Sequence, residues 1–199
     1  MDTFFYSLVK PLLKFLIWFV YHPTVVGKEN IPKEGPVVLA GNHTRWSDPP
    51  TLCAIVPKRQ VHFLAKIELF KKKSTSWIAK GMGCIPVDRK IHDKGALDSA
   101  INALKKDLCI GIFPEGTINR TDDVIMPFKI GAVKMSHDAK ATLVPFIITG
   151  KYRLFRKGVR IEFLPPIKIE DDLEKTNERL MEAVKNGLIK NGGRKNEGK

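Results

Sequence analysis

The sequence predicts an α/β protein with a single domain, in which a mixed, largely parallel sheet is flanked by helices. Short apolar strands alternate along the chain with segments whose apolar residues recur at helical spacing. The continuous apolar stretch 108–113 has the composition of a strand that is buried on both faces, as strands of parallel sheets are. The length of 199 residues suits one hydrophobic core, and no repeat or linker divides the chain.

Each expected element follows from a local pattern. Pro49 and Pro50 begin a short helix that Pro57 ends, because proline fits the first turn of a helix but not its interior. Either Asp171 or Asp172 can cap the last helix. The expected helices are 49–55, 68–80, 96–106, 130–139 and 173–189. The expected strands are 24–27, 37–40, 61–65, 84–87, 108–113, 143–148 and 159–164.

We divide the chain into an N-terminal segment, 1–23, a folded domain, 24–190, and a polar, glycine-rich tail, 191–199, that is expected to fray. The N-terminal segment is rich in Phe, Leu, Ile, Val and Trp, and its longest uninterrupted apolar run is 15–20. That run is far shorter than the ~20 residues that cross a bilayer. No small-residue cleavage site follows it, so we do not expect a signal peptide.

Aromatic and basic side chains lie together in this N-terminal segment. Trp18, Phe19 and Tyr21 beside Lys10 and Lys14 suit the headgroup boundary of a membrane, so we expect the segment to be an interfacial, membrane-associating helix. A core helix that packs on the domain would use the same residues. Both interpretations can hold for different faces of one helix.

The charge of the chain narrows the class of partner. Lys plus Arg is 34 and Asp plus Glu is 21, which gives a net charge of +13 and favours an anionic partner. We expect no nucleic acid, because no nucleic-acid-binding motif, P-loop or dinucleotide fingerprint is present and the apolar N-terminus favours lipid. The wide spacing of Cys53, Cys84 and Cys109 predicts buried, reduced thiols and neither a zinc site nor a disulfide framework.

A histidine and an aspartate follow the second expected strand. His43 and Asp48 would stand on the order of 17 Å apart in an extended chain, so they can meet only if the loop turns back. Ser47, Asp48 and Pro49 favour such a turn. A carboxylate on one imidazole nitrogen leaves the other free as a base for an alcohol. Equally, Asp48 could cap the helix that Pro49 begins, and His43 could be a hydrogen-bonded turn residue.

Two further polar clusters follow expected strands. Gly116 could direct its N–H at an oxyanion and Glu115 could accept from a hydroxyl, although this Pro-x-Gly run alone favours a simple turn. Arg89 can bind a phosphate with two hydrogen bonds, and Lys66 offers a second cation. The alternatives are an ion pair of Arg89 with Asp88 and a solvated Lys66.

Five motifs occur in order along the chain, and together they resemble one family. They are Asn-His-x4-Asp at 42–48, Ala-Lys-x-Glu-Leu at 65–69, Gly-x-Ile-x-Val-Asp-Arg at 83–89, Phe-Pro-Glu-Gly-Thr at 113–117 and Val-Pro-Phe at 144–146. Their order and gaps resemble the glycerolipid acyltransferases, specifically the bacterial 1-acylglycerol-3-phosphate acyltransferases. The resemblance spans residues 37–150.

The resemblance implies an enzyme that moves a fatty acyl group from a thioester, acyl-coenzyme A or acyl carrier protein, to the sn-2 hydroxyl of lysophosphatidic acid. His43 would be the general base and Asp48 would orient it. No metal and no resident cofactor are implied. The expected location is peripheral or monotopic at the cytoplasmic face of the cell membrane. A hydrolase is disfavoured because no Gly-x-Ser-x-Gly nucleophile elbow is present.

The resemblance also implies the residues that bind the acceptor. Lys66 and Arg89 would hold its phosphate, Glu115 would place the glycerol, the Gly116 amide would face the oxyanion, and Thr117 completes this substrate-binding run.

The sequence departs from the family pattern at two positions. Arg45 stands where the family usually has Ser, and Ile118 where it usually has Arg, with Arg120 the next arginine. These changes leave open another lysophospholipid or glycerol 3-phosphate as acceptor, or an inactive relative that binds phospholipid.

Overall fold

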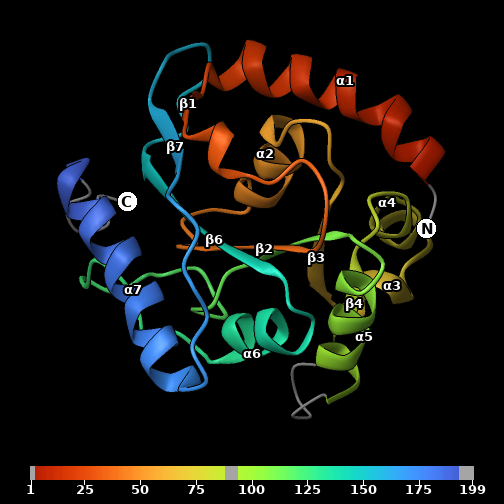
Figure 1. The fold of residues 1–199 in the computed structure, drawn as a ribbon. Helices are drawn as coiled ribbons and strands as arrows, with labels where there is room; N and C mark the ends of the chain where they lie inside the picture. Colours follow the sequence, from red (N-terminus) through yellow and green to blue (C-terminus); the bar gives the residue numbers. More distant parts are fainter. Residues whose placement is uncertain (1–2, 88–93, 193–199) are drawn as a thin grey trace.

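A seven-stranded sheet lies at the centre of the computed structural model, which describes residues 3–87 and 94–192 (Figure 1). The strands are β1 (Thr24–Val26), β2 (Val37–Gly41), β3 (Val61–Lys66), β4 (Ile85–Val87), β5 (Cys109–Ile112), β6 (Thr142–Gly150) and β7 (Val159–Phe163). Their order in the sheet is β1-β7-β6-β2-β5-β3-β4. Among these strands only β6 and β7 pair antiparallel. The predicted mixed, largely parallel α/β domain is confirmed.

Helices cover both faces of this sheet. They are α1 (Thr3–Tyr21), α2 (Asp48–Ile55), α3 (Glu68–Lys71), α4 (Lys73–Gly81), α5 (Lys94–Leu104), α6 (Gly131–Asp138) and α7 (Leu173–Lys190), together with a short 3-10 helix, η1 (Lys28–Asn30). Helices α1 and α2 lie on one face, and α5, α6 and α7 lie on the other (Figure 1). Of the two predicted caps for α7, Asp172 is the one used, because its side chain accepts from the N–H of Lys175.

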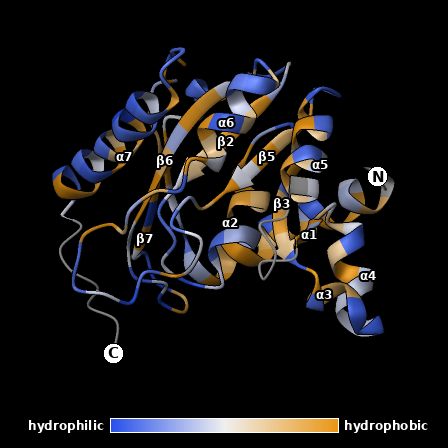
Figure 2. Ribbon diagram, turned by 90° about the horizontal axis from the view of Figure 1, so that it is seen from below, coloured by the Kyte–Doolittle hydropathy of each residue, from blue (hydrophilic) through white to orange (hydrophobic). Residues whose placement is uncertain are grey.

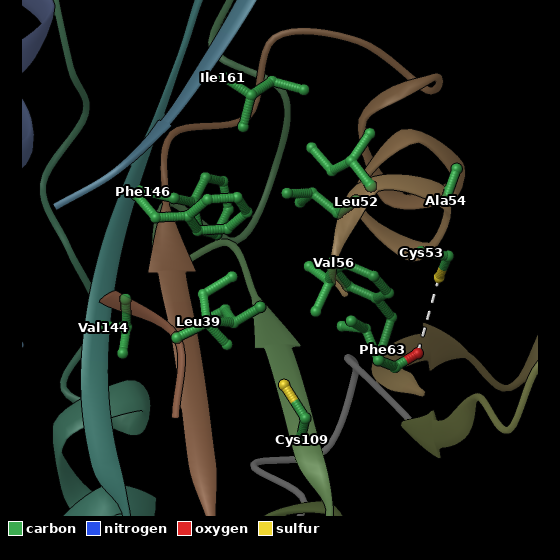
Figure 3. Packing of buried hydrophobic residues seen from close by; sticks show 14 of the residues in the cluster. Leu39, Leu52, Cys53, Ala54, Val56, Phe63, Cys109, Val144, Phe146 and Ile161 are labelled. Carbon is green, nitrogen blue, oxygen red and sulfur yellow. Dashed lines mark hydrogen bonds between the residues drawn. The ribbon is translucent and has the colours of Figure 1, made fainter. Parts of the chain in front are cut away.

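The central strand β2 is buried on both faces, as its unbroken apolar sequence requires. Val37 and Leu39 pack in the cluster under α1 and α2, whereas Val38 and Ala40 pack in the cluster under α5 to α7. Figure 2 shows the strands largely in the colours of hydrophobic residues and much of the outer surface of α7 in blue. Figure 3 shows Leu39 of β2 and Phe146 of β6 on the face of the sheet that packs against Leu52 of α2. These layers hold the parallel strands rigidly side by side.

The expected helix 68–80 is wrong in one respect, because the chain breaks it at Lys72. Lys72 is extended, with φ −90° and ψ 127°, and separates α3 from α4. The Thr75 hydroxyl donates to the carbonyl of Leu69 at 2.7 Å, and the N–H of Ser76 donates to that of Lys72 at 2.8 Å. A side-chain donor thus replaces the helical continuation at the end of α3.

The inner face of α1 belongs to the core. Tyr6 and Ile17 are buried, and the Tyr6 hydroxyl donates to the carbonyl of Cys53 in α2 at 3.0 Å. The ammonium of Lys10, expected at the headgroup boundary, instead donates to the carbonyls of Val56 and Arg59, each at 2.7 Å. Lys10 therefore points into the domain, because the carbonyls of the C-cap residue of α2 and of the loop that follows attract a cation.

The outer face of α1 is exposed and apolar. The exposed large side chains are Leu8, Leu12, Phe15, Leu16, Trp18 and Phe19. Most of them recur at helical spacing and form one stripe along the helix. We call these six residues the outer stripe of α1. The inner face of the N-terminal segment thus packs on the domain as a core helix does, whereas membrane association of the apolar outer face stays a prediction.

Candidate active site

The parallel pairing of β2, β3 and β5 brings the polar clusters to one edge of the sheet. These strands end at Gly41, Lys66 and Ile112, and the carboxyl ends of parallel strands meet at the same edge. His43 follows the first of them and Glu115 the last. His43 and Glu115, which are 72 positions apart in the sequence, are therefore in direct contact: the backbone N–H of His43 donates to Glu115 Oε1 at 2.8 Å.

At Asn42, just before His43, a side chain takes over the pairing of β2 with β6 from the backbone. Backbone pairing of β2 with β6 ends at Gly41, and the side-chain amide of Asn42 continues it. Its Nδ2 donates to the carbonyl of Ile148 at 2.9 Å, and its Oδ1 accepts from the N–H of Ile148 at 2.8 Å. Because the side chain substitutes for a strand residue, the backbone of His43 is free to turn.

His43 and Asp48 meet, as the turn chemistry predicted. Nδ1 of His43 lies 2.9 Å from Oδ2 of Asp48, whose side chain is fully buried. The alternative role for Asp48 as a helix cap is not adopted, because Ser47 occupies the N-cap and Asp48 is the first helical residue. The carboxylate turns back to the loop instead.

The loop and a distant tyrosine surround the Asp48 carboxylate with donors. Its Oδ2 accepts from the backbone N–H groups of Thr44 at 2.6 Å and Arg45 at 2.8 Å. Its Oδ1 accepts from the hydroxyls of Thr44 at 3.1 Å and Tyr152 at 2.9 Å. Burial and the negative charge of Asp48 both raise the pKa of Tyr152, so this phenol stays a donor. These hydrogen bonds replace the water that the buried charge has lost.

The imidazole of His43 is held on several sides. Its ring stacks on Phe113, with ring centroids 4.0 Å apart and planes 15° apart. Its backbone carbonyl accepts from the N–H of Asn119 at 3.1 Å. Since the side chain is 13% exposed and Nδ1 is engaged with Asp48, Nε2 is the ring atom that can take a proton from a bound molecule.

Glu115 supports the backbone of this site. It is buried, and while one oxygen accepts from His43, the other accepts from the N–H of Met126 at 3.0 Å. Burial raises the pKa of its carboxyl, and the two backbone donors act in the opposite direction. The expected contact of Glu115 with a substrate glycerol remains a prediction, whereas its contacts here position the loop that carries His43.

Gly116 forms the turn that its sequence favours. Its φ is +74°, a conformation that glycine adopts readily, and its N–H donates to the carbonyl of Phe113 at 2.9 Å. The N–H expected at an oxyanion thus closes the turn. Thr117 is exposed, and the side chain of Lys129 lies over Gly116, because a Cβ at Gly116 would meet Lys129 Nζ at 3.1 Å. No local sequence pattern marks Lys129 as a residue of this site.

Of the predicted phosphate-binding pair, Lys66 and Arg89, only Lys66 lies among the residues that the structure describes. Lys66 is exposed at the end of β3 and lies opposite Val87 in the register with β4. Arg89 and Asp88 lie outside the described residues. Tyr152 and Asn119 were also missed, because each belongs to a loop far along the chain from the residue it contacts.

Comparisons with known proteins agree on one family. A family model described as Acyltransferase matches residues 22–149. The 1-acyl-sn-glycerol-3-phosphate acyltransferase of Bacillus subtilis is 36% identical over 137 residues, which are 67% of this chain and 67% of that protein. The enzyme of the same name from Streptococcus pneumoniae is 31% identical over 198 residues, 94% of this chain and 71% of that protein.

A solved structure shares the fold. The crystal structure of the 1-acyl-sn-glycerophosphate (LPA) acyltransferase PlsC from Thermotoga maritima superposes with a TM-score of 0.76 at 23% identity. The match covers 95% of this chain and 82% of that one. At this identity it supports the architecture described above.

The raised pKa of Glu115 predicts a pH dependence of stability. The folded state keeps the Glu115 proton to a higher pH than the unfolded state, so this group makes the free energy of unfolding fall as pH rises from about 4.5 to its raised value. Glu115→Gln cannot titrate, so the stability of the wild type relative to this variant should decrease across that interval. Urea denaturation over a pH series measures it, with Glu182→Gln on exposed α7 as the matched control. A difference that does not change with pH would contradict the prediction.

Proposed function

Because the chain belongs to the acyltransferase family, and within it to the 1-acyl-sn-glycerol-3-phosphate acyltransferases, we propose that it acylates the sn-2 hydroxyl of 1-acylglycerol-3-phosphate to give phosphatidic acid. The acyl group comes from a thioester, either acyl-coenzyme A or acyl carrier protein. The observation that carries this proposal is the contact of 2.9 Å between His43 and the fully buried Asp48.

His43 acts as the general base in a single acyl transfer. With Asp48 accepting from Nδ1–H, Nε2 takes the proton of the acceptor hydroxyl while its oxygen attacks the thioester carbonyl. The carbon–sulfur bond then breaks, and the leaving thiolate takes the proton from the imidazolium. Asp48 stabilises that cation while it exists. No acyl-enzyme forms on this path, so a covalent acyl-protein that is competent for transfer would overturn it.

Basic residues bind the acceptor. Lys66, at the end of β3, and Arg89 hold its phosphate, and Lys129 adds a positive charge beside the Gly116 turn. The exposed Arg45, which stands where the family usually has Ser, supports a second candidate, a different lysophospholipid or glycerol 3-phosphate as acceptor. An inactive lipid-binding relative would show no transfer to any of them.

The outer stripe of α1 binds the membrane that supplies the acceptor. Large apolar side chains are exposed along this helix, and contiguous exposed apolar surface is typical of membrane contact. Within the described residues no helix meets the length and hydropathy needed to traverse a bilayer. We propose peripheral or monotopic attachment at the cytoplasmic face.

Thiol release in detergent tests the chemistry directly. Acyl-coenzyme A and acyl carrier protein are each supplied with lysophosphatidic acid, and we expect release that depends on the acceptor. His43→Ala should lower the rate at least about 100-fold, because a positioned base contributes that much or more. His137→Ala, which replaces an exposed histidine on α6, should leave the rate unchanged. Transfer at the wild-type rate by His43→Ala would refute the base assignment.

Tyr152 should affect the rate of acyl transfer through its hydrogen bond to Asp48. Tyr152→Phe keeps the ring packed on Tyr21 but removes the hydroxyl that donates to Asp48 at 2.9 Å. We expect kcat to fall about tenfold, the effect of one hydrogen bond to a charged group. Tyr21→Phe is the matched control and should leave kcat unchanged. If Tyr152→Phe lowers only the unfolding midpoint, its role is structural.

The phosphate-binding residues predict a change in affinity for the acceptor. Arg89→Ala and Lys66→Ala should each raise the KM for lysophosphatidic acid about tenfold, with kcat little changed, because their contact is present before the reaction begins. Lys80→Ala, at an exposed site in α4, serves as the control. A loss confined to kcat at saturating acceptor would mean that these charges act in the transition state.

A further inference from the structure

The loop between β6 and β7, residues 151–158, is a closed hairpin that stands beside the C-terminal end of α1 (Figure 1). Its ends are tied by a hydrogen bond from the N–H of Lys151 to the carbonyl of Gly158 at 3.1 Å. At Gly150 the φ is +78°, and a Cβ there would lie 1.9 Å from the Gly158 oxygen, so glycine is required for this tight closure. The hairpin therefore has a defined shape.

The tip of this hairpin exposes large apolar side chains. Leu154 is 64% exposed and Phe155 is 62% exposed. Phe155 has a φ of 55°, unusual for a bulky residue, which the neighbouring backbone sustains: its N–H donates to the carbonyl of Val20 at 2.6 Å. The fold thus keeps the aromatic side chain of Phe155 exposed to solvent and not buried in the core.

Phe155 extends the outer stripe of α1. Its ring meets that of Phe19 edge-on, with centroids 5.6 Å apart, and Phe19 in turn stacks on Phe15 at 5.8 Å. Each of these three rings is substantially exposed. Helix and hairpin therefore present one continuous apolar surface.

Cations flank the apolar tip. Arg153, Arg156 and Lys157 are all exposed, and the sequence of the hairpin contains no acidic residue. Apolar side chains between basic ones are the arrangement that inserts at a headgroup boundary while arginine and lysine meet anionic phosphates. A neutral apolar partner would not use these charges.

We propose that hairpin 151–158 is a second membrane contact, which binds the anionic phospholipids of a bilayer beside α1. It rests on the proposed function, because an acyltransferase that takes its acceptor from a membrane must sit on that membrane. Tyr152, in the first part of the same hairpin, bonds to Asp48. The hairpin consequently fixes the orientation of the catalytic pair relative to the lipid surface.

Sedimentation with vesicles tests this contact on the full chain, without substrates. The variant Arg153→Gln, Arg156→Gln, Lys157→Gln should bind phosphatidylcholine vesicles that contain phosphatidylglycerol about 100-fold more weakly than the wild type. Its binding to pure phosphatidylcholine should change little. A second variant, Leu154→Ser with Phe155→Ser, should weaken binding to both kinds of vesicle. The matched control is Lys105→Gln, Lys106→Gln, Lys134→Gln, which removes the same charge around α5 and α6 on the other side of the sheet.

The outcomes separate the proposals. Vesicle binding of the hairpin variant equal to that of the control variant overturns the membrane contact, and so does hairpin-dependent binding to an oligonucleotide in place of vesicles. If the triple variant has a lowered unfolding midpoint, the single variants Arg156→Gln and Lys157→Gln decide in its place. Failure of the wild type to release thiol in detergent would refute the proposed function alone, because binding is measured without turnover.

Discussion

The buried carboxylate of Asp48 is the constraint on which the candidate active site depends. A charge without water must be surrounded by donors, and here they come from the adjoining loop and from the β6–β7 hairpin. The loop after β2 turns back because its N–H groups supply that need. His43 is brought to Asp48 by the same turn, so the geometry of this pair and the satisfaction of a buried charge are one arrangement.

The sheet supplies the second part of this arrangement. Parallel pairing of β2 and β5 places Phe113 under the His43 ring and Glu115 against its backbone. Phe113 also stacks on Phe63 of β3 and meets Phe146 of β6, so the surface beneath the imidazole is continuous with the core. Packing of the strands thereby limits the freedom of the His43 ring.

Local patterns predicted most of the elements and offered the contact of His43 with Asp48 as one of two alternatives, but they did not predict contacts that depend on tertiary structure. The apolar strands and the proline-initiated α2 follow from neighbours in the sequence, and the turn-forming residues 47–49 allowed His43 to meet Asp48. Tyr152 contacts Asp48 from 104 positions away, and no local pattern marks it. The direction of the Lys10 side chain likewise depends on where α2 ends. Its position among aromatic residues in the sequence suggested the outer face of α1, whereas the structure places it on the inner face.

The Gly116 turn and the break at Lys72 show a different limit. In both, a local hydrogen bond competes with the expected use of the backbone: the Gly116 N–H closes a turn, and Thr75 ends α3. The sequence indicates that a glycine or a threonine at such a position can interrupt regular structure, but it does not indicate which hydrogen-bond partner the residue takes.

The two-sided character of α1 has a practical consequence for protein engineering. Deleting this helix to improve solubility would uncover the carbonyls that Lys10 binds at the end of α2, and α2 begins with Asp48. The deletion would therefore disturb the C-terminal end of the helix whose first residue is Asp48. Polar substitutions confined to the outer stripe would reduce aggregation and leave those contacts in place.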